Sequence, residues 1–153
     1  MSRRIALVVI LASVVALATG CKSNKPKEGG DIAADEMGTF TCKDVKSDVC
    51  VGPTDRFEAT VPVVHMTHRT KDLPQNGDVY VIQWIAEDVG EAAPANTVIA
   101  TLNEDVTDVV AGTKNYVVNT KLTKPTEGWP VGKYRVEVKL ADKPVTTARF
   151  VIE

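Results

Sequence analysis

Strict alternation of apolar and charged residues is the feature of this sequence that most limits what it can fold into. In KYRVEVKL (133–140), every second residue from Tyr134 to Leu140 is apolar, and each residue between them is charged. Successive side chains of a β-strand point to opposite faces, so this segment has one apolar face and one charged face. The pattern predicts an antiparallel strand with one side in water.

Other segments also show the patterns of strands. VYVIQWIA (79–86) has apolar residues on both faces and predicts a central strand covered on both sides. In FEATVPVVHMTHR (57–69), Pro62 indicates an edge strand or a bulge. A seventh strand would lie around Phe40. The remaining predicted strands are TVIATL (97–102), YVVNTKL (116–122) with Tyr116, Val118, Thr120 and Leu122 buried, and VTTARFVIE (145–153) with Ala148, Phe150 and Ile152 inward.

Turn-forming clusters separate these segments, and none of them shows a sustained helical period. The sequence therefore predicts an all-β fold, an antiparallel β-sandwich of six to seven strands over residues 55–153. Trp84 in an early strand and GKYRV (132–136) at the start of a late one resemble bacterial immunoglobulin-like domains. The resemblance implies an immunoglobulin-like sandwich with Tyr134 as its "tyrosine corner". Val136 stands where antibody domains have a cysteine, so their inter-sheet disulfide is absent.

The first 20 residues have the parts of a secretory signal peptide. Two basic residues, Arg3 and Arg4, precede an uncharged run from Ile5 to Gly20 that ends in small side chains. A membrane-spanning helix needs about 20 apolar residues, so a lone spanning helix is the weaker alternative for this run. We therefore predict a signal peptide over residues 1–20.

The end of this run resembles the lipobox of bacterial lipoproteins. The residues are LATGC (17–21), with Ala18 where that family most often has leucine. The resemblance implies cleavage before Cys21 and a diacylglyceryl lipid on its sulfur. Several acyl chains hold a protein stably at a membrane without a spanning helix. Because Lys22 follows, where aspartate would retain such a protein in the inner membrane, the resemblance implies the outer membrane.

A polar segment follows the lipobox cysteine. Residues 21–38 are nearly free of large apolar side chains and cannot bury enough surface to offset their ordering entropy. We predict a flexible tether whose ends lie roughly 20–25 Å apart on average. Cleavage before Cys21 would leave 16 basic and 20 acidic residues, a net charge of −4. This balance argues against nucleic acid as a partner, because phosphate binding needs clustered lysine and arginine.

Two cysteines remain, Cys42 and Cys50, in a compartment that favours oxidation. The sequence predicts that they form a disulfide that closes the segment 39–54. Zinc binding and thiol-redox catalysis are less favoured, since neither the paired close spacing of zinc sites nor a C-x-x-C motif is present.

The sequence offers little catalytic chemistry. After Cys21 the only serines are Ser23 and Ser47, and no nucleophile elbow or glycine-rich phosphate loop is present. We therefore expect no enzymatic activity and no cofactor. Copper binding by His65, Met66 and His68 is an alternative, because a thioether between imidazoles suits Cu(I). On a regular strand, however, His65 and His68 point to opposite faces, with Met66 and His68 packed inward or at the rim.

Two acidic loops and one tryptophan are further candidates. Oxygen ligands from loops at one end of a sandwich can hold Ca²⁺. Trp129 in EGWPVG is either a plug at the end of the sandwich or an exposed contact for a partner. The acidic residues of the two loops are Asp88, Glu91, Glu104, Asp105 and Asp108.

Together these features predict a lipid-anchored envelope protein with a non-catalytic binding or structural domain. Its partners would be the membrane, through the N-terminal lipid, and envelope proteins or cell-wall components. A subunit of a secretion or cell-wall assembly is a further alternative.

Overall fold

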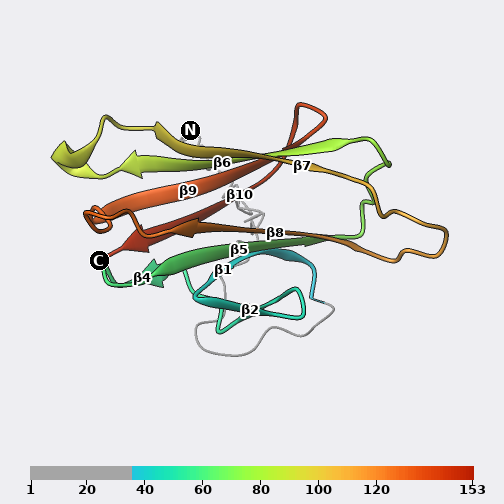
Figure 1. The fold of residues 1–153 in the computed structure, drawn as a ribbon, viewed down its shortest axis with the longest axis horizontal. Helices are drawn as coiled ribbons and strands as arrows, with labels where there is room; N and C mark the ends of the chain where they lie inside the picture. Colours follow the sequence, from blue (N-terminus) through green and yellow to red (C-terminus); the bar gives the residue numbers. More distant parts are fainter. Residues whose placement is uncertain (1–35) are drawn as a thin grey trace, which may run out of the picture.

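A computed structural model describes residues 36–153, and these residues form two facing β-sheets (Figure 1). The seven longer strands confirm the predicted antiparallel sandwich, and three strands of two or three residues are added to them. Apart from one 3-10 turn, Gly90–Ala92, the described residues contain no helix. The strands are β1 (Gly38–Cys42), β2 (Asp44–Lys46), β3 (Val49–Val51), β4 (Arg56–Phe57), β5 (Val63–Thr70), β6 (Val79–Asp88), β7 (Thr97–Asp105), β8 (Tyr116–Thr123), β9 (Gly132–Leu140) and β10 (Lys143–Ile152).

The strand order defines an immunoglobulin-like sandwich. One sheet has the order β1-β5-β8 and the other β4-β10-β9-β6-β7. All neighbours in these sheets are antiparallel except β4, which runs parallel to β10. The hairpin β2-β3 forms a third, two-stranded sheet. Because β1 pairs with β5, residues 39–42 of the segment 39–54 belong to the sandwich.

The core fills the space between the two sheets. Its largest fully buried side chains include Trp84 and Tyr80 of β6, Tyr134 of β9 and Phe150 of β10. The ring of Phe150 stacks on Tyr134 at a centroid distance of 5.2 Å and lies edge-on to Trp84 at 6.0 Å. From the facing sheet, Val64, Met66 and Val118 complete this cluster.

The strand β9 has the predicted alternation, with Tyr134, Val136 and Val138 buried. The Tyr134 hydroxyl donates a hydrogen bond of 2.5 Å to the carbonyl oxygen of Pro130, four residues earlier. This bond is the tyrosine corner of immunoglobulin-like domains, so that prediction is confirmed. It fixes the end of the β8–β9 connection against the core.

Two details of the predicted strands are wrong. Residues 57–69 do not form one strand, because β4 ends at Phe57 and the chain crosses to the other sheet before β5 begins. A turn in which the Val61 amide donates to the Glu58 carbonyl makes this crossing, and Pro62 only precedes β5. The second detail concerns β6, which is paired on both edges but is not buried on both faces. Val79, Val81 and Gln83 on its outer face are only half-buried.

Candidate functional site

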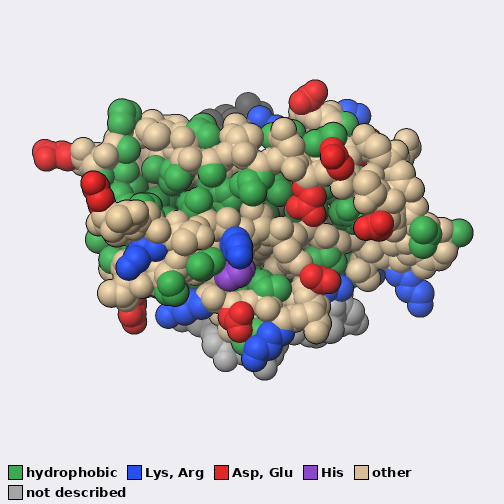
Figure 2. Space-filling model, in the orientation of Figure 1, with side chains coloured by type: hydrophobic (Ala, Val, Ile, Leu, Met, Phe, Trp, Pro, Cys, Tyr) green, Lys and Arg blue, Asp and Glu red, His purple; other side chains and the backbone are tan. Residues whose placement is uncertain are grey.

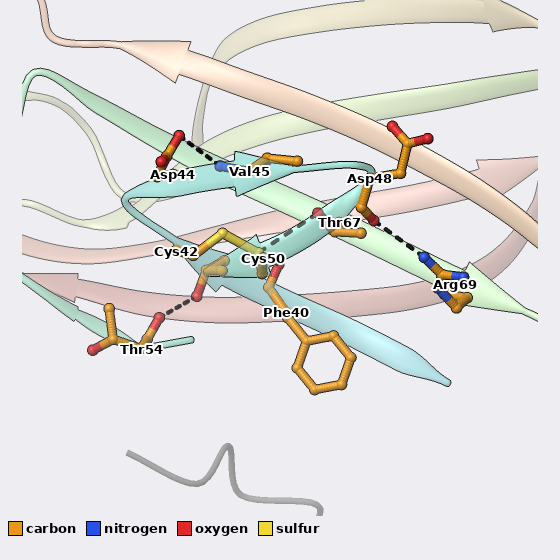
Figure 3. The surroundings of a disulfide bond; sticks show 10 residues. Phe40, Cys42, Asp44, Val45, Asp48, Cys50, Thr54, Thr67 and Arg69 are labelled. Carbon is orange, nitrogen blue, oxygen red and sulfur yellow. Dashed lines mark hydrogen bonds between the residues drawn. A yellow bond between two sulfur atoms is a disulfide. The ribbon is translucent and has the colours of Figure 1, made fainter. Parts of the chain in front are cut away.

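The β2-β3 hairpin is held on the outer face of the three-stranded sheet by a disulfide (Figure 3). Cys42 at the end of β1 is bonded to Cys50 of β3, with the Cα atoms 5.7 Å apart, which confirms the predicted disulfide. The Cys50 sulfur lies 3.5 Å from the Thr67 hydroxyl oxygen of β5. Thr67 is only 3% exposed, although it points away from the core of the sandwich. The hairpin therefore covers part of the sheet that would otherwise meet water.

The turn of this hairpin is fixed by polar contacts to two strands of the sheet. Asp48 adopts a positive φ of 62°, which turns the chain sharply between β2 and β3. Its carbonyl oxygen accepts a hydrogen bond of 3.3 Å from Arg69 of β5, and its carboxylate accepts one of 2.7 Å from Asn119 of β8. The hairpin and the sheet therefore form one rigid surface.

Removing the disulfide is expected to destabilise the domain by roughly 2–3 kcal/mol, the chain-entropy value for so short a loop. The double variant Cys42→Ala/Cys50→Ala tests this expectation in chemical denaturation. Because the Asp48 contacts to Arg69 and Asn119 do not depend on sulfur, the variant should still fold. A loss of less than about 0.5 kcal/mol would show that these polar contacts alone order the loop.

The structure does not bring His65, Met66 and His68 together. Met66 is fully buried in the core and His68 is 7% exposed on the same face of β5, as the packing alternative predicts. His65 pairs with Cys42 and Lys121, and it is half-buried on the opposite face. Among residues 36–153 no group of three or more His, Cys, Asp or Glu side chains could hold a metal ion.

The ring of His68 serves the packing of the two sheets. Its Nδ1 lies 2.8 Å from the hydroxyl of Thr39 on β1, and that hydroxyl lies 3.0 Å from the hydroxyl of Thr146 on β10. Its Nε2 is buried without a hydrogen-bond partner in the described structure. Burial lowers the pKa of His68 below its ordinary value of 6.5, because the charged ring would lose its hydration.

Stability is expected to fall on acidification because of His68. Below pH 6.5 the unfolded chain binds a proton at this ring and the folded chain does not, so the free energy of unfolding decreases as the pH falls towards the lowered pKa. The slope from one such group is at most about 1.4 kcal/mol per pH unit. Denaturant titrations between pH 7.5 and 5 should show a smaller slope for His68→Gln than for the wild type. Equal slopes would contradict the buried, neutral ring.

Trp129 plugs the end of the sandwich. Its side chain is 5% exposed, and its indole N–H donates a hydrogen bond of 2.6 Å to the carbonyl oxygen of Val61. The ring lies edge-on to Tyr134 at 6.0 Å. Of the two sequence interpretations the structure supports the plug, since neither the face nor the N–H of Trp129 is available to a partner.

The two acidic loops lie at opposite ends of one strand. Asp88 ends β6 and Glu91 lies in the β6–β7 connection, whereas Asp105 and Asp108 lie at or beyond the far end of β7. A calcium site shared by the two loops is therefore not formed. Glu104 faces the side of the core near Tyr80 and Tyr116, and burial raises the pKa of its carboxyl.

A small pocket on the outer face of the five-stranded sheet has no counterpart in the sequence predictions. It has a volume of about 140 Å³ and lies over the start of β9 and the end of β10. The side chain of Arg149 crosses it towards Glu87, with 3.5 Å between Nε and Oε2. Charged residues that are far apart in the sequence lie close together here, and no local sequence motif predicts this arrangement. The lining residues are Asp55, Glu87, Lys133, Tyr134, Arg149, Phe150 and Val151.

The predictions for the N-terminus lie outside the described residues. These predictions are the signal peptide over 1–20, the lipidated Cys21 and the tether up to residue 35. The last predicted tether residue, Gly38, is the first residue of β1. Within residues 36–153, no helix has the length and apolar character needed to cross a membrane.

The similarity of this chain to known proteins lies in its fold. No family model matches the sequence, and no curated protein matches it. Among solved structures, the chain is similar to an immunoglobulin-like protein from Pseudomonas aeruginosa, at 19% sequence identity and a TM-score of 0.47. The similarity covers 77% of this chain and 90% of that protein.

Proposed function

We propose that this chain is a lipid-anchored protein of the bacterial cell envelope, in which the immunoglobulin-like domain has a non-catalytic binding or structural role. One observation carries the proposal. Basic residues, an apolar run and LATGC (17–21) follow one another and give way at once to a polar segment. Lipid chains on Cys21 would hold the domain at a membrane, since more than one acyl chain gives stable anchoring.

The position of β1 supports a tethered domain. Gly38 pairs with Arg69 near the end of β5, so the polar segment joins the sandwich at the end that carries the connections 71–78 and 106–115. The connections at the other end, together with the outer face of the five-stranded sheet, would then be available to envelope proteins or cell-wall components. Loops on a rigid scaffold are common positions for such contacts.

The use of polar side chains supports a non-catalytic role. Several polar groups that could have carried chemistry make hydrogen bonds within the fold instead. His68 lies against Thr39, and the N–H of Trp129 donates to Val61. Arg135 donates to the carboxylate of Glu137 at 2.7 Å on the outer face. These contacts stabilise the fold, so a structural role is enough to explain why these polar residues are present.

Fractionation of bacterial cells tests the anchor. The full chain should pellet with membranes and enter the detergent phase of a detergent–water partition. The variant Cys21→Ser should be absent from the membrane pellet and from the detergent phase. The double variant Cys42→Ser/Cys50→Ser is the matched control, because it removes cysteines that are already bonded to each other. If Cys21→Ser stays in the detergent phase, the anchor is not this cysteine.

A density-gradient separation of inner and outer membranes tests the location. Because Lys22 follows Cys21, we expect the protein in the outer-membrane fractions, and Lys22→Asp should move it to the inner membrane. Wild-type protein in the inner-membrane fractions would contradict the proposed location while leaving the anchor itself intact.

A further inference from the structure

Two neighbouring connections at one end of the sandwich carry exposed apolar side chains. Val110, in the connection 106–115, is 69% exposed, more than any other large hydrophobic side chain of residues 36–153. Ala111 beside it is also exposed, and Leu73 in the connection 71–78 is 39% exposed. We call Leu73, Val110 and Ala111 the apolar tip. The connection 106–115 projects beyond the sheets at the right of Figure 1, and Figure 2 shows hydrophobic side chains at the same extremity.

Hydrogen bonds hold the apolar tip in place. The side-chain amide of Asn76 donates a hydrogen bond of 2.9 Å to the carbonyl oxygen of Val109, and the Val109 N–H donates one of 2.9 Å to the side-chain oxygen of Asn76. These two bonds join the two connections. The Thr113 N–H donates to the carbonyl oxygen of Val110 at 3.1 Å, and the Val110 N–H donates to the Thr113 hydroxyl at 3.2 Å. Val110 therefore lies on an ordered turn that keeps its side chain in solvent.

The stretches that form the apolar tip contain no charge. LPQNG (73–77) and VVAGT (109–113) lack acidic and basic residues. They can therefore enter an apolar medium without removing a charge from water, which is the most costly part of such a transfer. The lysines near them have long apolar stems that let their ammonium groups stay at the level of lipid headgroups. The charged residues within two positions of these stretches are Lys71, Asp72, Asp78, Asp108 and Lys114.

The apolar tip is too small to be the interface for a protein partner. A stable protein interface covers about 800 Å² and roughly 20–30 residues on each partner. A membrane needs far less from a domain that is already attached to it, because attachment raises the effective concentration of the domain at the surface to the order of millimolar. Weak apolar contacts then suffice to hold the domain in one orientation.

The entry point of the chain distinguishes this end of the sandwich from the other. Val131, in the β8–β9 connection at the opposite end, is 63% exposed, so exposure alone does not separate the two ends. Gly38 pairs with Arg69, two residues before the connection 71–78 begins, so the chain from Cys21 enters the domain beside the apolar tip. Lipid on Cys21 would keep this end near the membrane and Val131 away from it.

We propose that the apolar tip inserts into the lipid headgroup region of the membrane that holds Cys21, so that the domain stands on its tethered end. This inference rests on the proposed lipid anchor, to which it adds the orientation of the domain and the residues that contact lipid. The strands would run outwards from the membrane surface, because they connect the two ends of the sandwich (Figure 1). The opposite end, with the connections 89–96 and 124–131, would face away from the lipid and be free for envelope partners.

Fluorescence quenching in lipid vesicles tests the contact. The full-length chain with Val110→Cys is extracted from bacterial membranes, labelled with a thiol-reactive fluorophore and reconstituted into vesicles of phosphatidylethanolamine and phosphatidylglycerol. Only the introduced cysteine should react, because Cys42 and Cys50 are bonded to each other and Cys21 would carry lipid. Val131→Cys is the matched control, since it replaces an equally apolar and similarly exposed valine at the opposite end. Spin-labelled lipids should quench the Val110→Cys label at least about threefold more strongly than the Val131→Cys label.

Equal quenching at the two positions, or stronger quenching at Val131→Cys, would overturn the proposal. A Val110→Cys label that is shielded from a water-soluble quencher but not quenched by lipid would overturn it as well, because a protein and not lipid would then cover the tip. Flotation of the same vesicles separates these failures from a failure of the anchor. A chain that floats without quenching at Val110→Cys keeps the anchor and loses the docking, whereas a chain that does not float has neither.

A charge at the apolar tip tests whether the protein surface, and not the fluorophore, enters the membrane. Ala111→Asp, added to the labelled Val110→Cys chain, should reduce the quenching at least about threefold, because its carboxylate would have to leave water. Val131→Asp adds the same charge at the opposite end and should leave the quenching unchanged. Unchanged quenching with Ala111→Asp would show that the fluorophore inserts by itself, and the proposal would be wrong.

Discussion

Replacing Gly132 by alanine is expected to destabilise the domain by about 4 kcal/mol, since both backbone strain and overpacking oppose a side chain there. Gly132 has a φ of 151°, which residues with a Cβ rarely adopt. A Cβ at this position would lie 2.3 Å from the carbonyl oxygen of Asp88 and 2.8 Å from the Cα of Val89. Both neighbours are backbone atoms at the end of β6, so no rotation of a side chain can relieve the contact. For a domain of this size the melting temperature should fall by roughly 15 °C.

The variant Gly128→Ala separates the two causes. Gly128 also has a positive φ, 96°, but a Cβ there would meet no atom within 4 Å. Its replacement should cost only the conformational part, about 1–2 kcal/mol. If thermal unfolding shows equal losses for the two variants, the close approach of β9 to the end of β6 does not exist in solution.

Trp84→Ala is expected to destabilise the domain by about 3–5 kcal/mol, the usual loss when a large aromatic side chain is removed from a core. The indole of Trp84 is 1% exposed and contacts the ring of Phe150. Its N–H donates a hydrogen bond of 3.3 Å to the hydroxyl of Thr120 on β8, so this residue joins the two sheets. Urea denaturation of the two proteins measures the difference.

A double-mutant cycle isolates the polar part of this link. Thr120→Val leaves the buried indole N–H without its acceptor and should cost about 1–3 kcal/mol, whereas the same change in Trp84→Phe should cost less. Strictly additive losses would show that the bond between Trp84 and Thr120 is not formed.

Much of the sandwich can be predicted from the sequence because its strands alternate in polarity. The segment 133–140 alternates between apolar and charged residues throughout, and the resemblance to immunoglobulin-like domains implied the tyrosine corner at Tyr134, which the structure contains. Short strands carry no such signal. Three residues of β2 or two of β4 are too few for a period, and only pairing with distant residues makes them strands.

The candidate sites were harder to predict because they depend on long-range placement. Alternation along β5 correctly separated His65 from His68. The two acidic loops flank a single predicted strand, 97–102. Because the two ends of one strand must lie apart, a calcium site shared by these loops could have been rejected from the sequence. That β7 is an edge strand, by contrast, depends on the order of strands in the sheet, which no local pattern contains.

The intact mass of the protein extracted from bacterial membranes tests the central claim, that Cys21 anchors this domain through lipid. We expect a chain that begins at residue 21, carries the added mass of acyl chains on its first residue, and keeps Cys42 and Cys50 bonded to each other. A chain that still contains residues 1–20, or one that begins at Cys21 without added mass, would contradict it.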